Sequence, residues 1–456
     1  MMDSIVKTKY GEIQGLEEED CFLFLGIPFA LPPIDNLAFS HPMPPKPFEG
    51  IYDATKGKTN PIQGEGVASV PNNSLDCLYL NVFVPKGLKE ATPVIVWIHG
   101  GSYSHGGSGA KNESGRPLEY ELAFFAKETK TIVVSINYRL NLFGFLDLTS
   151  FGPSFEANNG LYDQIMALRY IKENIAFFGG NPNNVTLLGQ SAGAASILAL
   201  LEMHEARPLF HKAIMMSPCV DSFFSKEEGE KLTKKYLSYL HLKKKDITPR
   251  TLSNLPIRKI QKANDKLEAS LIAKGEFRCA FSPIVDGKTI HVFPKNGISD
   301  SSKPILIGHT KNEADLFVEP VPGFVLPFAK LLLGIKPKKM KGRLRRRISD
   351  ALTDEIYINP VHDVLKAYNG MAYYYQLDYI NQKYADKGMG PYHVSDIPIV
   401  FGLDWGNHQD VNPRDVHVGR KYRAMFSSFA YKGAVNFPSF KVNERPHIID
   451  FDGILI

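Results

Sequence analysis

Cysteine is scarce in this sequence, with four residues in 456, at positions 21, 77, 219 and 279. So few cysteines exclude a disulfide-stapled scaffold, and their wide spacing excludes the closely paired ligands of a structural zinc site. The first 15 residues contain no apolar core followed by small residues, so no signal peptide is expected. No run of 18 apolar residues occurs, which excludes a polytopic membrane protein. These absences predict a reduced, cytoplasmic protein.

A strong excess of charge is also missing. The 53 Lys and Arg against 48 Asp and Glu leave a net charge of +5, which gives no reason to expect a nucleic-acid partner. Internal repeats and low-complexity segments are absent, and 44% hydrophobic with 22% charged residues is ordinary for a globular protein. This composition excludes wholesale disorder. Nothing in the sequence specifies an oligomeric state.

What the sequence does contain is a series of short apolar runs with helical patterns between the later ones. The runs typical of buried strands are Tyr79–Val84, Val94–Ile98, Ile132–Ile136, Val185–Leu188, Lys212–Met216, Pro304–Gly308 and Met371–Leu377. Helical periodicity covers Asp163–Asn174 and Ala192–Met203. The first 30 residues alternate apolar and polar with a break at Gly15, which predicts hairpin strands. The pattern indicates an α/β fold with a mostly parallel sheet covered on both faces.

Two regions differ in composition from the rest. Ser225–Lys274 is lysine-rich with a helical period, which predicts a solvated helical insertion. Lys330–Arg347 holds nine Lys or Arg and no acid, and it overlaps the end of the apolar segment Gly323–Ile335. It is interpreted either as a surface helix pair near a substrate entrance or as a basic amphipathic element on an anionic membrane surface.

The most informative motif is Gly189-Gln-Ser191-Ala-Gly193, which directly follows an apolar strand and precedes a helix. In a nucleophile elbow the serine occupies a strained strand-to-helix turn, so the flanking positions need residues almost without side chains. The two glycines meet that requirement, and the helix N-terminus favours negative charge beside Ser191. The alternative is a serine that merely caps the helix.

A second motif follows the strand Val94–Ile98, where the chain reads His99-Gly100-Gly101. Backbone N–H groups in such a loop can turn inward without hindrance from side chains. With the N–H of the residue after the nucleophile, they form an oxyanion hole. The predicted donors are Gly100, Gly101 and Ala192, although Gly-Gly after a strand is also compatible with an ordinary tight turn.

Further informative segments are, in chain order, Gly26–Pro33, Asp76–Val82, Trp97–Gly101, Asn137–Leu146, Asn159–Gln164 and Asn174–Val185. These segments resemble type-B carboxylesterases, the branch of the α/β-hydrolase fold that includes cholinesterases and neuroligins. The resemblance spans nearly the whole chain. It implies a single α/β-hydrolase domain over residues 1–456, closest in character to non-secreted microbial carboxylesterases.

The resemblance also places the remaining members of a catalytic triad, whose acid and histidine follow the serine in this fold. The segment Ile305–Ala314 resembles the strand and turn that carry the acid and implies Glu313, with Asp315 as the fallback. The segment Gly390–Gly402 resembles the stretch that carries the histidine and implies His393. Asp396 then has a structural role.

These residues predict a serine carboxylesterase that hydrolyses small to medium uncharged esters through an acyl-enzyme, with no need of a metal or organic cofactor. A histidine base with an ordinary pKa of about 6.5 predicts that kcat/KM falls in acid. Two alternatives stay open. One is a non-catalytic, neuroligin-like binding protein, and the other is a lipase in which residues 323–347 form a lid.

The sequence departs from the family pattern at informative positions. Gln190 stands where many members carry Glu, and the Pro61–Asn73 stretch, where cholinesterases place a choline-binding Trp, has no aromatic residue. Both differences disfavour choline esters as substrates. Secreted members pair the cysteine that corresponds to Cys77 with one upstream, near Thr59–Gln63, where this chain has none. Cys77 is therefore predicted to be a free, buried thiol.

Overall fold

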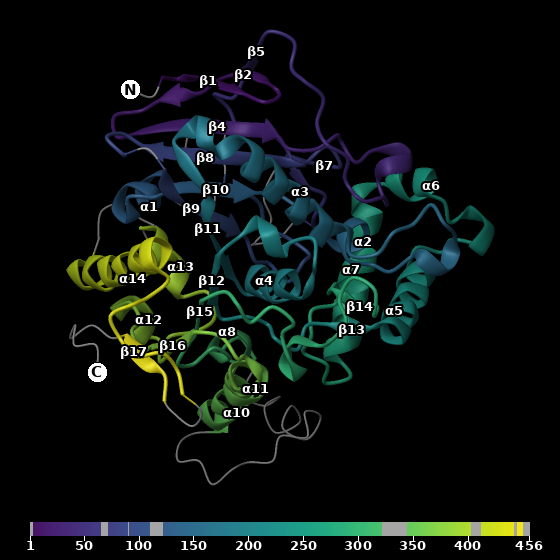
Figure 1. The fold of residues 1–456 in the computed structure, drawn as a ribbon. Helices are drawn as coiled ribbons and strands as arrows, with labels where there is room; N and C mark the ends of the chain where they lie inside the picture. The colour runs from purple at the N-terminus through teal and green to yellow at the C-terminus, as the bar shows by residue number, and fades with distance from the viewer. Residues whose placement is uncertain are drawn as a thin grey trace.

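The computed structural model describes residues 3–64, 72–89, 91–109, 122–321, 344–402, 412–441 and 445–449. In these ranges a ten-stranded sheet runs through the middle of the molecule (Figure 1). Its strands in chain order are β3 (Leu16–Glu17), β4 (Cys21–Pro28), β8 (Tyr79–Pro85), β9 (Thr92–Ile98), β10 (Ile132–Ile136), β11 (Gly180–Gln190), β12 (Lys212–Met216), β15 (Ile305–Thr310), β16 (Ala372–Leu377) and β17 (His447–Ile449).

The spatial order of the strands is β17-β16-β15-β12-β11-β9-β10-β8-β4-β3. Every neighbouring pair from β17 to β10 is parallel, whereas β8, β4 and β3 continue the sheet in antiparallel pairings. The mostly parallel α/β sheet expected from the sequence is therefore confirmed. The carboxyl ends of parallel strands lie at one edge of such a sheet, where ligands bind in open α/β folds.

Helices lie around this sheet (Figure 1). Their bounds are α1 (Leu122–Thr129), α2 (Asn141–Gly144), α3 (Asn159–Asn174), α4 (Ala192–Glu202), α5 (Lys226–Tyr239), α6 (Pro249–Ser253), α7 (Ile257–Ile272), α8 (Asp315–Val318), α10 (Leu344–Thr353), α11 (Asn359–Ala367), α12 (Gln382–Ala385), α13 (Asp396–Phe401) and α14 (Pro413–Lys432). One π-helical turn, η7 (Asp354–Ile358), joins α10 to α11.

Two apolar cores sandwich the sheet, and the central strand β9 contributes to both. All seven residues of β9 are buried. Val94, Val96 and Ile98 point into the core shared with α3 and α4. Ile95 and Trp97 point into the core shared with α1, α13 and α14. This alternation explains why the strand reads as a continuous apolar run, because a strand covered on both faces has no solvent side.

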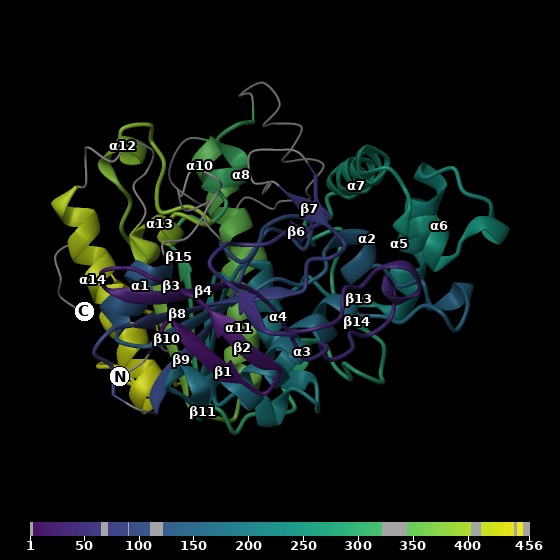
Figure 2. The ribbon, with the colours of Figure 1, turned by 90° about the horizontal axis from the view of Figure 1, so that it is seen from above.

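The lysine-rich segment forms the helices α5, α6 and α7, as its period predicted. They lie together on the opposite side of the molecule from α13 and α14 (Figure 2). Helix α5 begins at a capping box in which the Ser225 hydroxyl accepts from the Glu228 N–H and the Glu228 carboxylate accepts from the Ser225 N–H. A short parallel pairing of β13 (Phe224–Ser225) with β14 (Ile284–Val285) fixes the base of this insertion.

The N-terminal strands are where the sequence placed them. Two of them, β1 (Ile5–Thr8) and β2 (Gly11–Gln14), form a hairpin that β5 (Ile51–Asp53) joins. A further short pair consists of β6 (Asn60–Pro61) and β7 (Asn73–Ser74). Strand β11 is longer than the expected Val185–Leu188, because it starts at Gly180, pairs there with Thr92, and resumes regular pairing at Val185 after a register shift.

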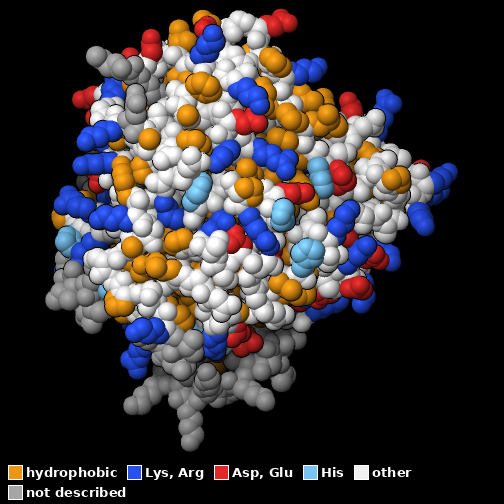
Figure 3. All heavy atoms as spheres, in the orientation of Figure 1, with side chains coloured by type: hydrophobic (Ala, Val, Ile, Leu, Met, Phe, Trp, Pro, Cys, Tyr) orange, Lys and Arg blue, Asp and Glu red, His pale blue; other side chains and the backbone are white. Residues whose placement is uncertain are grey.

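On the face shown in Figure 3, Lys and Arg side chains are interspersed with acidic and apolar ones. None of the helices in the described ranges combines the length and apolar character that crossing a bilayer requires. Most of the basic segment Lys330–Arg347 lies outside the described residues. Within its last residues, Arg345 donates to the carbonyls of Val318, Glu319 and Val321, so that side chain is engaged inside the protein.

Candidate active site

Ser191 lies at the sharp turn between β11 and α4. Its φ of 56° and ψ of −121° are unusual for a residue with a side chain, and such strain is typical of functional turns. The flanking glycines are sterically required. A Cβ on Gly193 would lie 2.1 Å from the carbonyl oxygen of Ile98, and one on Gly189 would lie 2.6 Å from the carbonyl carbon of Gly193. The motif therefore forms the strand-turn-helix elbow that the sequence predicted.

The His99-Gly100-Gly101 loop passes directly beside this elbow. A Cβ on Gly100 would lie 3.2 Å from the Cβ of Ser191, and Gly101 has a φ of +106°. The backbone N–H groups of Gly100, Gly101 and Ser102 have no acceptor within the described ranges. The N–H of Ala192 belongs to the first turn of α4, where helix geometry provides no acceptor. The loop and the helix thus bring unpaired donors to the same place.

His99 holds this loop in position. Its side chain is fully buried, its Nδ1 lies 2.8 Å from the Gly100 carbonyl oxygen, and its ring stacks on Tyr138. Burial lowers the pKa of His99 to about 4, so the ring is neutral at physiological pH. The Gly100 carbonyl and the Gly101 N–H share one planar trans peptide and point in opposite directions. By fixing the carbonyl, His99 also fixes the direction of the Gly101 N–H.

Glu313 and His393 meet Ser191 at the carboxyl edge of the sheet. His393 Nε2 lies 2.9 Å from Ser191 Oγ, and His393 Nδ1 lies 2.6 Å from Glu313 Oε2. An imidazole whose Nδ1–H donates to a carboxylate presents the Nε2 lone pair to the serine hydroxyl. The three residues selected from the sequence are therefore in one hydrogen-bonded chain.

The Glu313 carboxylate has further donors that the sequence did not reveal. Its Oε1 accepts from the Ser217 hydroxyl at 2.5 Å and from the Thr310 N–H at 2.6 Å. Burial raises the pKa of this carboxyl, but its interactions with His393, Ser217 and Thr310 outweigh burial, so the net shift is downward. Glu313 thus stays ionised at neutral pH. Ser217 directly follows β12, so the only signal for it was its place at the end of a strand.

Two loops are bonded to each other to make this arrangement. The Asn312 N–H donates to the Pro391 carbonyl at 2.8 Å, and the His393 N–H donates to the Glu313 carbonyl at 3.1 Å. Asp315, the fallback acid, accepts from the Gly390 N–H at 2.7 Å. It also accepts from Arg346 and Ser349 of α10. Asp315 therefore ties the histidine loop to α10, which is a structural position.

Asp396 lies in the first turn of α13, three residues after His393, and is 1% exposed. Its Oδ1 has no hydrogen-bond partner within the described ranges. Burial and the nearby charge of Glu313 raise the pKa of Asp396 to about 7. A carboxyl in this environment is substantially protonated at neutral pH, unlike Glu313, although the two acids flank the same histidine.

Further side chains that lie close to His393 were not identified as site residues from the sequence. Gln190 Nε2 lies 3.4 Å from His393 Nε2. The ring of Tyr357, in the π-helical turn η7, lies 4.9 Å from the His393 ring, and that of Phe317 lies 6.0 Å away. A π-helical turn is rare and frequently marks a functional site. No local sequence pattern predicts one here.

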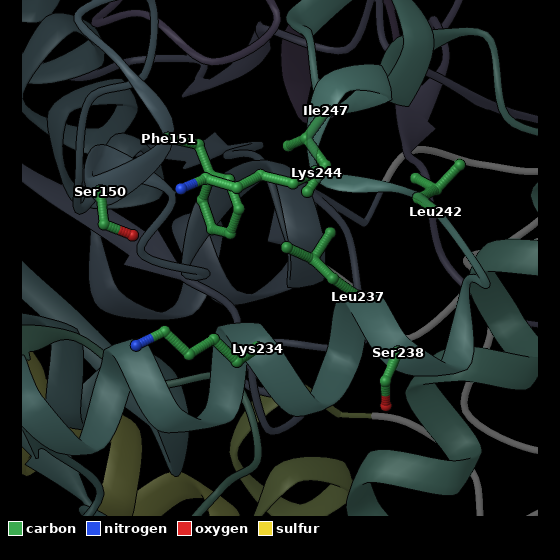
Figure 4. Close-up of a pocket in the computed structure, with 8 residues that line it drawn as sticks. All are labelled: Ser150, Phe151, Lys234, Leu237, Ser238, Leu242, Lys244 and Ile247. Carbon is green, nitrogen blue, oxygen red and sulfur yellow. The ribbon is translucent and has the colours of Figure 1, made fainter.

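A pocket of about 470 Å³ lies at the helical insertion, and its lining does not include Ser191, Glu313 or His393. Figure 4 shows the ammonium groups of Lys234 and Lys244 on the side of the pocket where Ser150 lies. Its lining residues are Ser150, Phe151, Lys234, Leu237, Ser238, Leu242, Lys244 and Ile247. None of these belongs to the serine, acid or histidine segments. In the part of the chain that the structure describes, no group of three or more His, Cys, Asp or Glu is arranged to hold a metal ion.

In an α/β-hydrolase, the nucleophile lies at a strained strand-to-helix turn of a mostly parallel sheet, and an acid and a histidine follow it in chain order. This chain has that arrangement, with a strained serine at the β11–α4 turn and a buried acid and a histidine after it. The solved structures agree. The chain superposes on a thermophilic pNB esterase with a TM-score of 0.82 at 31% identity, covering 98% of this chain and 96% of the other. A carboxylesterase of Geobacillus stearothermophilus gives a TM-score of 0.82 at 28% identity, with the same coverage of both chains.

Residues 2–324 and 329–447 match the model of the carboxylesterase family, so the chain belongs to that family. It is a carboxylic ester hydrolase. Its relatives include the para-nitrobenzyl esterase of Bacillus subtilis, which is 32% identical over 98% of this chain and 95% of the relative. An acetylcholinesterase of Bungarus fasciatus is 30% identical over 97% of this chain and 80% of its own length.

Proposed function

We propose that the protein is a serine esterase in which Ser191 is the nucleophile, His393 the general base and acid, and Glu313 the residue that orients and stabilises the histidine. The observation that carries this proposal is the unbroken hydrogen-bonded chain, 2.9 Å from Ser191 to His393 and 2.6 Å from His393 to Glu313. The first distance is within the reach required for proton transfer between a nucleophile and its base, and the second is a hydrogen bond that orients the base.

The proposed reaction proceeds in two halves. His393 takes the Ser191 proton as the oxygen attacks the ester carbonyl carbon, and the ionised Glu313 stabilises the imidazolium that results. His393 then protonates the departing alcohol, which leaves an acyl group on Ser191. A water molecule enters, gives its proton to His393 and attacks the acyl carbon. Ser191 is released with its proton restored, and the acid leaves.

The oxyanion that forms in each half is proposed to accept hydrogen bonds from the N–H groups of Gly100, Gly101 and Ala192. Two findings support this role. Among the described residues these donors have no acceptor beside Ser191, and His99 fixes the direction of the Gly101 peptide. Donors set in place before the reaction are effective because they need no reorganisation when the charge develops. The N–H of Ser102 is a further candidate, since it adjoins these donors and is also unpaired within the described ranges.

We propose small to medium uncharged esters as the substrate class. The residue next to the nucleophile is the neutral Gln190, whose side chain lies beside His393, so this position offers no carboxylate to a cationic alcohol. The aromatic rings of Tyr357 and Phe317 give the histidine side of the site an apolar character. Para-nitrobenzyl esters are suitable first probes, because a relative that matches almost the whole chain is named for them.

A cytoplasmic location and a single domain over residues 1–456 remain proposals. All four cysteines are free, and Cys77 is buried as expected, which supports a reducing compartment.

The lipase alternative depends on residues 323–347, most of which lie outside the described ranges. It predicts a jump in rate once the substrate exceeds its solubility limit. The membrane contact expected of the basic segment Lys330–Arg347 predicts retention on anionic vesicles in co-sedimentation.

The test is hydrolysis of short and medium p-nitrophenyl esters by the wild type and by Ser191→Ala. Loss of the nucleophile in a working triad reduces kcat on the order of 10⁶-fold. Ser154→Ala is the matched control, because Ser154 is exposed and distant in sequence from every site segment. Full activity of Ser191→Ala, or equal inactivity of all three folded proteins, would refute the proposed mechanism.

A further inference from the structure

Two cysteines converge beside the proposed nucleophile, and the esterase mechanism uses neither. Cys219 Sγ lies 3.5 Å from Ser191 Oγ. Cys219 and Cys279 are partly accessible, whereas Cys21 and Cys77 are buried. These two partly exposed cysteines are 60 residues apart in the chain, yet their side chains lie close enough for each to shift the pKa of the other. A chain so poor in cysteine thus brings half of its thiols together at its active site.

The backbone explains why these thiols meet. Strands β13 and β14 are parallel with Phe224 opposite Ile284, and each cysteine lies five residues before its member of that pair. Ser222 links the two approaching segments. Its N–H donates to the Cys219 carbonyl at 3.0 Å, and its hydroxyl oxygen accepts from the Cys279 N–H at 3.1 Å and lies 3.4 Å from Cys279 Sγ. The contact between the thiols therefore rests on two segments held in register.

The electrostatic environment makes the two sulfurs unequal. Hydrogen bonds from Cys219, Ser222 and Ser102 lower the pKa of Cys279, even though burial opposes this shift. The hydrogen bond to Cys279 raises the pKa of Cys219, as does burial. Cys279 is thus the better nucleophile, since the thiolate is the reactive form of cysteine. Cys219 is placed to act second, as a resolving thiol.

We propose that Cys219 and Cys279 are a thiol-modification site in the wall of the active site, and that a hydroperoxide oxidises them to a disulfide that inhibits ester hydrolysis. The Cys279 thiolate attacks the terminal peroxide oxygen, the O–O bond breaks, and the departing alkoxide takes up a proton to leave as alcohol or water. The Cys219 sulfur then attacks the sulfenic sulfur. The S–O bond breaks, and the hydroxyl leaves as water with the Cys219 proton. Two sulfurs each lose one electron, and the peroxide gains two.

The inhibition follows from the position of the sulfurs, and this part rests on the proposed function of Ser191. A disulfide bond of about 2.05 Å is much shorter than a contact between thiols, so its formation pulls the two segments together. The Cys219 sulfur then leaves its place beside Ser191 Oγ. Cys279 also interacts electrostatically with the side chain of Ser102, which follows the His99-Gly100-Gly101 loop, so the proposed disulfide would disturb that loop as well. A displacement on the order of 1 Å near the chemistry lowers activity by up to about 10²-fold.

The experiment treats the purified full-length protein with hydrogen peroxide, digests it with trypsin without reductant, and measures p-nitrophenyl ester hydrolysis in parallel. Trypsin places the two cysteines in separate peptides, residues 213–226 and 279–288. We expect these peptides to become linked with the loss of two hydrogens. We also expect kcat/KM to fall at least about tenfold, within the range for small displacements of reacting groups. Both changes should reverse with a dithiol reductant.

Cys279→Ser and Cys21→Ser form the matched pair of variants, each compared with its own untreated activity. Cys279→Ser should resist peroxide, and Cys21→Ser should be inhibited like the wild type. Equal inhibition of Cys279→Ser would overturn the inference, as would linked peptides with unchanged activity or the absence of linked peptides in inhibited wild type. The disulfide link between the two peptides is detected independently of catalytic activity. A protein that forms it but hydrolyses no ester would refute the esterase mechanism and leave the thiol site standing.

Discussion

The two halves of the proposed active site are built in different ways. The serine half is local, since Ser191 takes its position from a strand, a helix and the two glycines of one short motif. The acid and histidine half is assembled, since Glu313 and His393 are 80 residues apart and are joined by hydrogen bonds between two loops. A local turn is encoded by a few residues in sequence, whereas an assembled contact depends on how distant segments pack. The assembled half should therefore respond to changes some distance from the chemistry.

The largest effect expected in the assembled half comes from Glu313→Gln. An amide in place of the carboxylate favours the wrong histidine tautomer and no longer stabilises the imidazolium, so kcat should fall about 10⁴-fold. Steady-state hydrolysis of a p-nitrophenyl ester measures this change. Glu12→Gln, at an exposed position of β2, is the control and should retain wild-type kcat. A loss below tenfold for Glu313→Gln would contradict the role of the acid.

Asp396 gives the assembled half a pH-dependent stability. Its folded pKa of about 7 exceeds the ordinary value of 3.8, so between these pH values the folded protein holds a proton that the unfolded chain has lost. Rising pH therefore lowers the free energy of unfolding through this group, and the decrease is complete above pH 7. Asp396→Asn lacks this ionisation. Its free energy of unfolding relative to that of the wild type should therefore rise by about 4 kcal/mol between pH 4 and pH 8, at 1.36 kcal/mol per pH unit.

Urea unfolding of both proteins at the two pH values tests this prediction. The free energy of unfolding of Asp396→Asn minus that of the wild type should grow with pH. An equal difference at pH 4 and pH 8 would show that Asp396 ionises normally in the folded state.

The serine half should be sensitive to steric clashes that lower the stability of the protein. In Gly193→Ala the new Cβ would lie 2.1 Å from the Ile98 carbonyl oxygen, a backbone atom that cannot move aside cheaply. Overpacking costs about 1–3 kcal/mol in the free energy of unfolding, and a clash with a backbone atom should lie at the upper end of that range. Gly64→Ala is the control, because its new Cβ would meet nothing closer than 3.8 Å. Denaturant unfolding measures both, and equal stability of the two variants would refute the steric account of the elbow.

Asp315→Asn should affect the assembled half more than the stability of the protein. Loss of the charge weakens the bonds from Arg346, Ser349 and Gly390 that hold the histidine loop. A small displacement of His393 should lower kcat/KM about 10- to 10²-fold, since misplacement by 1 Å has effects of this size. The exposed Asp386→Asn is the control. A decrease in stability with unchanged kcat/KM would assign Asp315 to the scaffold alone.

The contrast between the two halves also explains what the sequence could predict. The buried strands, the α/β class and the elbow followed from apolar runs and from Gly189 and Gly193, because these signals are local. Glu313 and His393 were selected by family resemblance and chain order, since composition alone could not choose among 13 His and 48 acids. Ser217 was not predicted as a site residue, because its role depends on which segments pack together.

The central claim, that a histidine delivered by a distant loop activates Ser191, is tested most directly by covalent labelling with a fluorophosphonate. Wild type and His393→Gln are treated in parallel, and the adduct is located by peptide mass spectrometry. The account predicts one adduct per chain on Ser191 in the wild type, with loss of esterase activity, and far slower labelling of the variant. An adduct on another residue, or equally fast labelling of the two proteins, would contradict it.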